Sequence, residues 1–136
     1  MKSPLTWITC IAAAIVLAGL LFPTGGCYIP AKVVRAHNDV NMVRAALIAY
    51  RSEYGILPAG DHRAIVRSLL GDNQRKIVFL EFNAKQRSPE GDFLDPWGSA
   101  YRIDTSDLSN PTARSPGKDK KDEPYKHESD DICSWR

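Results

Sequence analysis

Residues 31–54 read AKVVRAHNDVNMVRAALIAYRSEY, and their pattern predicts the longest helix of the domain. Apolar side chains recur in it at spacings of three and four, the period of one face of an α-helix. Gly55 follows the last of them and Pro58 comes soon after, so we expect the helix to end at Tyr54. The expected packing face consists of Val33, Ala36, Val40, Val43, Leu47, Tyr50 and Tyr54.

This apolar face is one-sided, because the charged residues of the stretch fall mostly elsewhere on the helix. Those residues are Lys32, Arg35, Asp39, Arg44, Arg51 and Glu53. A helix with one apolar side needs a surface to cover it. We expect the rest of the domain to provide that cover, with packing against a partner helix as a second use of the N-terminal end.

The beginning of the chain is of a different kind, since residues 3–31 carry no charged side chain. Residues 7–22 (WITCIAAAIVLAGLLF) form an almost unbroken apolar run. A helix needs ~20 residues to cross the ~30 Å hydrocarbon core of a bilayer, so this run is marginally long enough. Three interpretations stay open: an uncleaved membrane anchor, a secretory signal, or a lipoprotein signal that ends at a lipidated Cys27. All three divide the chain into an anchor or signal over residues 1–30 and a periplasmic domain over residues 31–136.

Length, charge and cysteine content narrow the class of protein. The chain has 136 residues, with 18 Lys and Arg against 16 Asp and Glu, a net charge of +2. That length allows one small domain, and the balanced charge argues against nucleic-acid binding. The sequence has three cysteines, Cys10, Cys27 and Cys133, and no two of them form a C-x-x-C pair. The sequence therefore does not indicate a zinc site or thioredoxin-type chemistry. Cys27 and Cys133 can pair in an oxidising compartment unless Cys27 is lipidated.

Short elements are expected after the long helix. Asp61 is expected to cap a helix over residues 62–70, which Gly71 ends. Residues 77–80 (IVFL) are typical of a buried strand, although a helical turn fits the same run.

The second half of the chain carries turn and strand patterns. Residues 95–98 (DPWG) have the residue order of a β-turn. Tyr101 and Ile103 then alternate with charged residues as in a strand, and residues 112–115 form a second extended stretch. Residues 132–135 are apolar again and are expected to dock on the sheet.

Nothing in the sequence has the pattern of a catalytic site. No G-x-S-x-G, Walker or H-E-x-x-H motif is present. His37, His62 and His127 are scattered, without a second ligand at metal-binding spacing, so each is expected at the surface. We therefore predict a protein that is not an enzyme.

Four motifs follow one another along residues 31–136. They are YRSEYGILP at 50–58, DPWGSAY at 95–101, SPGKD at 115–119 and DDICSW at 130–135. In this order they resemble the major pseudopilin of bacterial type II secretion, general secretion pathway protein G. The resemblance implies an α+β, pilin-like fold, in which an N-terminal membrane helix continues into the long amphipathic helix. That helix would pack on a small, mostly antiparallel sheet.

The resemblance also implies a structural role. Members of the family stack by their N-terminal helices into a short periplasmic fibre. The implied partners are the inner membrane, other pilin-like subunits or the secretion machinery, and further copies of the chain. The implied location is the inner membrane, with the domain facing the periplasm.

Many members of the family bind calcium in the loop before the last segment. The matching positions here are Asp119, Asp130 and Asp131, with backbone oxygens near Ser115 completing the shell. Calcium takes about six to eight oxygen ligands, so three side chains do not suffice. The four lysines within residues 118–131 are expected to lower the affinity.

The start of the chain departs from the family pattern. Family precursors have a Gly before Phe-Thr-Leu-Ile-Glu-Leu, whereas residues 1–7 read MKSPLTW and the apolar run holds no Glu. Residues 23–26 (PTGG) also interrupt what the family has as a continuous helix. With small residues before Cys27, this departure favours an alternative function. The alternative is a membrane-tethered lipoprotein that uses the pseudopilin-like domain as a binding module.

Overall fold

The computed structural model describes residues 30–123 and 130–135. The apolar run, Cys27 and His127 lie outside the described residues, so the interpretations of residues 1–29 stay predictions. Among the described residues, no helix has the length and apolar character needed to cross a membrane. The elements are α2 (Ala31–Tyr54), α3 (His62–Leu69), the 3-10 helix η1 (Ala84–Gln86), β1 (Arg102–Asp104), β2 (Thr112–Ser115) and β3 (Ile132–Cys133).

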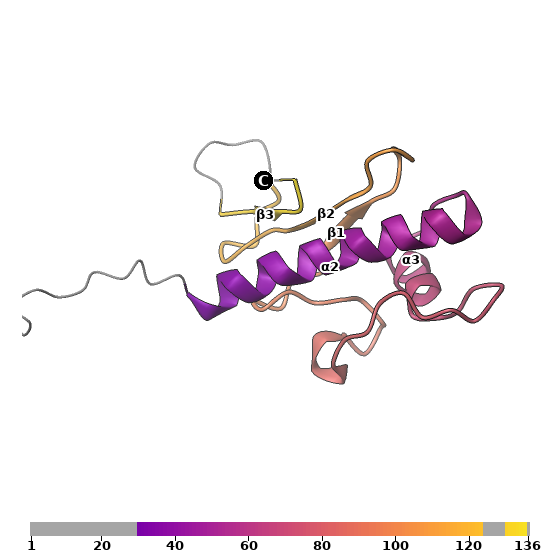
Figure 1. The fold of residues 1–136 in the computed structure, drawn as a ribbon. Helices are drawn as coiled ribbons and strands as arrows, with labels where there is room; N and C mark the ends of the chain where they lie inside the picture. Colours follow the sequence, from indigo (N-terminus) through magenta and orange to yellow (C-terminus); the bar gives the residue numbers. More distant parts are fainter. Residues whose placement is uncertain (1–29, 124–129, 136) are drawn as a thin grey trace, which may run out of the picture.

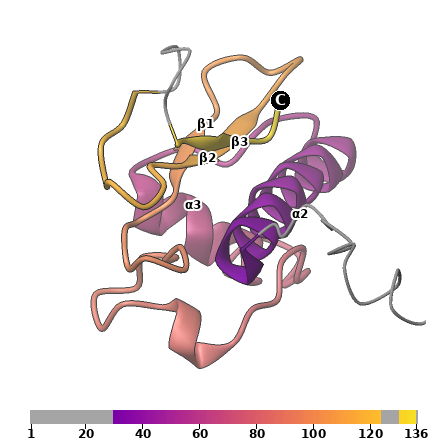
Figure 2. The same cartoon turned by 90° about the vertical axis from the view of Figure 1, so that its left-hand side faces the viewer.

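One long helix packs on a small antiparallel sheet, as the expected α+β class requires. The strand order is β1-β2-β3, with Ile103 opposite Ala113 and Arg114 opposite Cys133. The sheet lies along one side of α2, which contacts β2 and β3, and α3 lies beside α2 (Figure 1). The irregular segment between α3 and β1 runs along the side of α2 away from the sheet (Figure 2).

The predicted face of α2 is confirmed as the centre of the core. Ala36, Val40, Val43 and Leu47 are fully buried, and the remaining members of the face, Val33, Tyr50 and Tyr54, are half-buried. The cover is the rest of the domain, as expected. The helix ends where predicted, because Gly55 adopts a left-handed φ of 72° and its N–H donates to the carbonyl of Arg51.

The expectation that Asp39 lies away from this face is wrong, since its side chain is buried. Asp39 comes three residues after Ala36 and four before Val43, so it shares their side of the helix. The Tyr101 hydroxyl donates to Asp39 Oδ2 at 2.8 Å, and the Arg35 guanidinium lies 3.6 Å from the same oxygen. Burial and the Asp39 charge raise the pKa of Tyr101, which keeps this hydroxyl a donor.

Residues 77–80 form neither the expected strand nor a helical turn. The N–H groups of Phe79 and Leu80 both donate to the carbonyl of Leu69, at 2.9 and 3.1 Å. These amides therefore satisfy the end of α3 rather than a neighbouring strand. Leu80 is buried, whereas Val78 is 51% exposed, so the run only partly enters the core.

The second helix is close to its prediction. Asp61 Oδ1 accepts a hydrogen bond from the N–H of Ala64 at 2.8 Å, which confirms the cap. His62 is half-buried rather than on the surface, and its Nε2 accepts a hydrogen bond from the N–H of Phe93 at 3.3 Å. Burial lowers the pKa of this imidazole and favours the neutral form that can accept. His37 is exposed, as expected.

Tyr101→Phe tests the buried pair in the core. The variant keeps the ring and removes the donor to Asp39, which leaves a buried carboxylate short of a partner. We expect the free energy of unfolding to fall by about 1–3 kcal/mol in urea titrations. Tyr54→Phe is the matched control, because its hydroxyl donates to Asn73 Oδ1 at 2.8 Å in a half-buried position. Equal losses of unfolding free energy in the two variants would show that the hydrogen bond from Tyr101 to the buried Asp39 carboxylate contributes no more than a half-buried one.

Candidate metal centre

The pairing of β2 with β3 brings the predicted metal ligands together. Ser115 ends β2 and pairs with Ile132, which begins β3. Residues 116–123 lead away from the end of β2, and residues 130–131 lead back to the start of β3 at the same end of the strand pair. The chain therefore returns to within side-chain reach of its own starting point.

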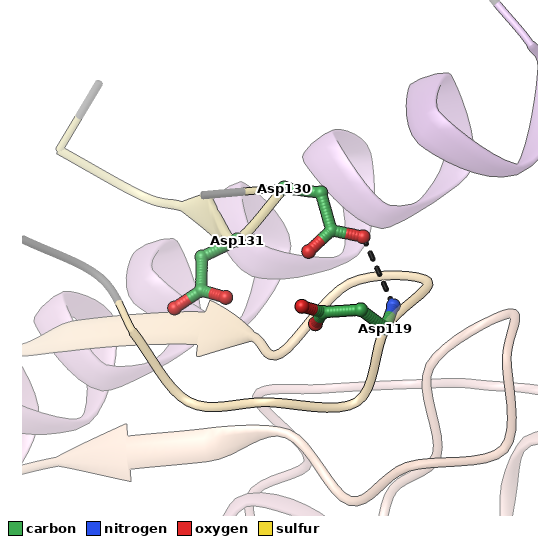
Figure 3. A group of neighbouring side chains, drawn as sticks. All are labelled: Asp119, Asp130 and Asp131. Atoms are coloured by element: carbon green, nitrogen blue, oxygen red, sulfur yellow. Dashed lines mark hydrogen bonds between the residues drawn. The ribbon is translucent and has the colours of Figure 1, made fainter. Parts of the chain in front are cut away.

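Three aspartates converge at this point, as the resemblance implies. One carboxylate oxygen from each of Asp119, Asp130 and Asp131 lies within 4.8 Å of the other two. Figure 3 shows the three side chains turned toward a common space between the loop and the start of β3. Asp119 and Asp130 are exposed, whereas Asp131 is only 7% exposed.

Backbone amides of the loop hold each carboxylate in place. Asp130 Oδ2 accepts hydrogen bonds from the N–H groups of Lys118 at 2.7 Å and Asp119 at 3.0 Å. Asp119 Oδ1 accepts one from the N–H of Lys121 at 2.9 Å. Asp131 Oδ2 accepts one from the N–H of Glu123 at 2.8 Å. The loop is thus folded around its own acidic groups.

One oxygen of the cluster has no such partner. Asp131 Oδ1 is buried and accepts no hydrogen bond from the part of the chain that the structure describes. Burial raises the pKa of the Asp131 carboxyl, and the negative charges of Asp122, Asp130 and Asp119 raise it further. An unpaired, buried carboxylate oxygen among like charges is costly, and a divalent cation would relieve both causes. The oxygen-only donor set fits a hard cation such as calcium.

Gly117 makes this close approach feasible, and sequence reasoning did not single it out for this role. Its φ is +73°, in the left-handed region. A Cβ built on Gly117 would lie 2.8 Å from Asp130 Cγ, closer than side-chain carbons pack. The Pro116-Gly117 pair signals a turn, but the facing residue is known only from the fold.

The remaining predicted site residues are not brought into the cluster. Cys133 is buried on β3, and Cys27 lies outside the described residues, so lipidation and disulfide pairing stay predictions. Lys118, Lys120 and Lys121 are exposed around the loop. They place positive charge near the cluster, and the expected reduction in calcium affinity stays a prediction.

The chain matches no protein-family model, no curated protein and no solved structure. The resemblance to the pseudopilin therefore depends on the four sequence motifs, and the pilin-like fold stays a prediction. The metal centre depends on the geometry of this chain.

Gly117→Ala tests the close approach to Asp130. The new methyl group would push the loop away from Asp130 and impose a left-handed conformation on an alanine. Gly98→Ala is the matched control, because Gly98 has a φ of +85° but no neighbouring atom within 4 Å of a Cβ. We expect Gly98→Ala to cost about 1–2 kcal/mol of unfolding free energy, from backbone strain alone. Gly117→Ala should cost measurably more in the same urea titration, and an equal loss would show that the contact with Asp130 is unimportant.

Proposed function

We propose that this protein is a non-enzymatic structural subunit or accessory protein of the cell envelope, similar to the type II secretion pseudopilin. It assembles with pilin-like partners through its N-terminal helix and binds calcium in the loop between β2 and β3. The observation that carries the proposal is the convergence of Asp119, Asp130 and Asp131 around a buried, unpartnered carboxylate oxygen. This convergence lies in the loop where the resemblance implies a calcium ion.

Calcium would act there as a structural cross-link. Asp119 belongs to the segment that leaves β2, and Asp130 and Asp131 belong to the segment that enters β3. A cation that binds both segments stabilises the pairing of the short strand β3 with β2. The three carboxylates carry three negative charges, which a divalent ion offsets in large part. Backbone carbonyls or water would supply the remaining ligands.

The outer face of α2 supports assembly. The inner face of α2 is buried in the core of the domain. On the outer face, the side chains of Val34 and Met42 are 44% and 41% exposed. Ala45 and Ala49 are exposed on the same side of the helix. This outer face is uncharged and carries small residues, which let a second helix approach closely.

The lipoprotein alternative has its own support in the sequence. Cys27 follows small residues, and the apolar run lacks the Glu of pseudopilin precursors. In that case the upstream helix is removed, and the domain acts as a tethered binding module. Labelling of the full chain with a fatty-acid analogue discriminates the two functions. Label that is lost in Cys27→Ser supports the lipoprotein, and absence of label supports the pilin-like subunit.

Calcium should raise the melting temperature of the purified chain, and a chelator should reverse the effect. At about 100 times its dissociation constant, calcium stabilises the folded state by ~2.7 kcal/mol. We expect Asp131→Asn to abolish the response and Asp119→Ala to reduce it, because each removes a ligand. Asp122→Asn is the control in the same loop, since Asp122 accepts hydrogen bonds from Arg114 at 2.7 and 3.0 Å and lies outside the cluster. Its charge acts on Asp131 only at a distance, so this variant should weaken the calcium response less than the loss of Asp119 or Asp131. An undiminished calcium response in Asp119→Ala would refute the site.

Assembly should depend on the outer face of α2. Chemical cross-linking in membranes is expected to give oligomers of the chain or adducts with pilin-like proteins. Met42→Arg places a charge on the outer face and should remove these products. Gln74→Arg is the control, because Gln74 is exposed outside α2. Cross-linked products that persist in Met42→Arg would count against packing through this face.

A further inference from the structure

We propose that Asp95 and Ser115 are positioning residues for the metal centre. Together they hold the loop after β2 against Asp130, so that the turn at residues 95–98 sets the geometry of the cation site. The inference rests on the proposed calcium site and deepens it, because neither residue belongs to the acidic cluster. Three consecutive contacts carry it.

The first contact fixes the Asp95 carboxylate. Asp95 is 4% exposed, and its Oδ1 accepts hydrogen bonds from the N–H groups of Trp97 at 2.9 Å and Ser99 at 2.8 Å. These bonds anchor the carboxylate within its own turn. Its Oδ2 is then free to accept from another element, and the Ser115 hydroxyl donates to it at 2.6 Å.

The second contact passes from Ser115 to the loop. A hydroxyl has one proton to donate and two lone pairs that accept. Because the Ser115 hydroxyl donates its hydrogen to Asp95, its lone pairs point away from Asp95. One of them accepts a hydrogen bond from the N–H of Gly117 at 3.0 Å. Ser115 is fully buried, so water does not compete for this bond. The hydrogen bond to Asp95 therefore sets the direction in which the hydroxyl binds Gly117.

The third contact passes from Gly117 to the cluster. Gly117 lies directly against Asp130, where even a methyl group would not fit. The next two N–H groups, those of Lys118 and Asp119, both donate to Asp130 Oδ2. A shift of Gly117 would therefore displace two of the three carboxylates, Asp119 and Asp130, relative to Asp131.

Ser134 offers a control that distinguishes the positioning of the loop from simple stabilisation of the sheet. Its hydroxyl is also buried and accepts a hydrogen bond from the N–H of Ala113 at 3.0 Å. Like the Ser115 hydroxyl, it binds a backbone amide, but this amide belongs to β2 rather than to the loop after it. Within the described residues the hydrogen bonds of Ser134 are to Ala113 and Arg44, outside the loop of residues 116–123, so Ser134→Ala should lower stability without moving the carboxylates.

The experiment compares Ser115→Ala with Ser134→Ala in the full chain purified in detergent. Calcium affinity is measured by calorimetric titration, and exchange of the Gly117 amide hydrogen is measured by NMR in the presence of a chelator. We expect Ser115→Ala to weaken calcium binding by about tenfold or more and to speed Gly117 exchange. Ser134→Ala should leave both close to wild type.

Asp95→Asn provides a second variant should Ser115→Ala not fold. Its Oδ1 still accepts from the turn, but the amide that replaces Oδ2 cannot accept the Ser115 proton. We expect weaker calcium binding and faster Gly117 exchange here too. Wild-type affinity and wild-type exchange in either folded variant would overturn the positioning role. A wild-type chain that binds no calcium would refute the metal site, and Gly117 exchange alone would then decide whether Asp95 and Ser115 hold the loop.

Discussion

The packing of α2 on β2 and β3 is the contact on which the rest of the domain depends. The strands have only three, four and two residues, and a sheet of that size is marginal without cover. The continuous apolar face of α2 supplies the cover, because its central members are fully buried. Asp39 lies on the same face and bonds Tyr101 just before β1, which ties the helix to the sheet at a defined point.

The same sheet places the candidate metal centre. The acidic residues converge only because β3 pairs with β2, and β3 is held on the sheet by α2. The turn at residues 95–98 is linked to the centre through the hydroxyl of Ser115. The loop that carries Asp119 is therefore fixed by the strand pairing and by the turn together. A surface loop with so many charges would otherwise be free to spread into solvent.

Local patterns in the sequence predicted local structure well. Three features of the helices depend only on residues a few positions apart, so they can be predicted from the sequence. They are the apolar period of α2, its end at Gly55 and the Asp61 cap of α3. Asp39 was misplaced because its partner Tyr101 lies 62 residues away. Residues 77–80 were misread because their amides bond the end of a helix. Asp119, Asp130 and Asp131 were named by resemblance, whereas the roles of Asp95, Ser115 and Gly117 leave no periodic signal and needed the fold.

The buried pair of Asp39 and Tyr101 has a mechanical consequence. A slide of α2 by one turn, ~5.4 Å, would move the Asp39 carboxylate away from its donor and into apolar surroundings. The helix therefore resists shear along its axis at this point, in addition to the resistance of its apolar contacts. Load applied at the Pro30 end would pass along a stiff rod and reach the rest of the domain through the bond between Asp39 and Tyr101 as well as through the contacts of α2 with β2 and β3.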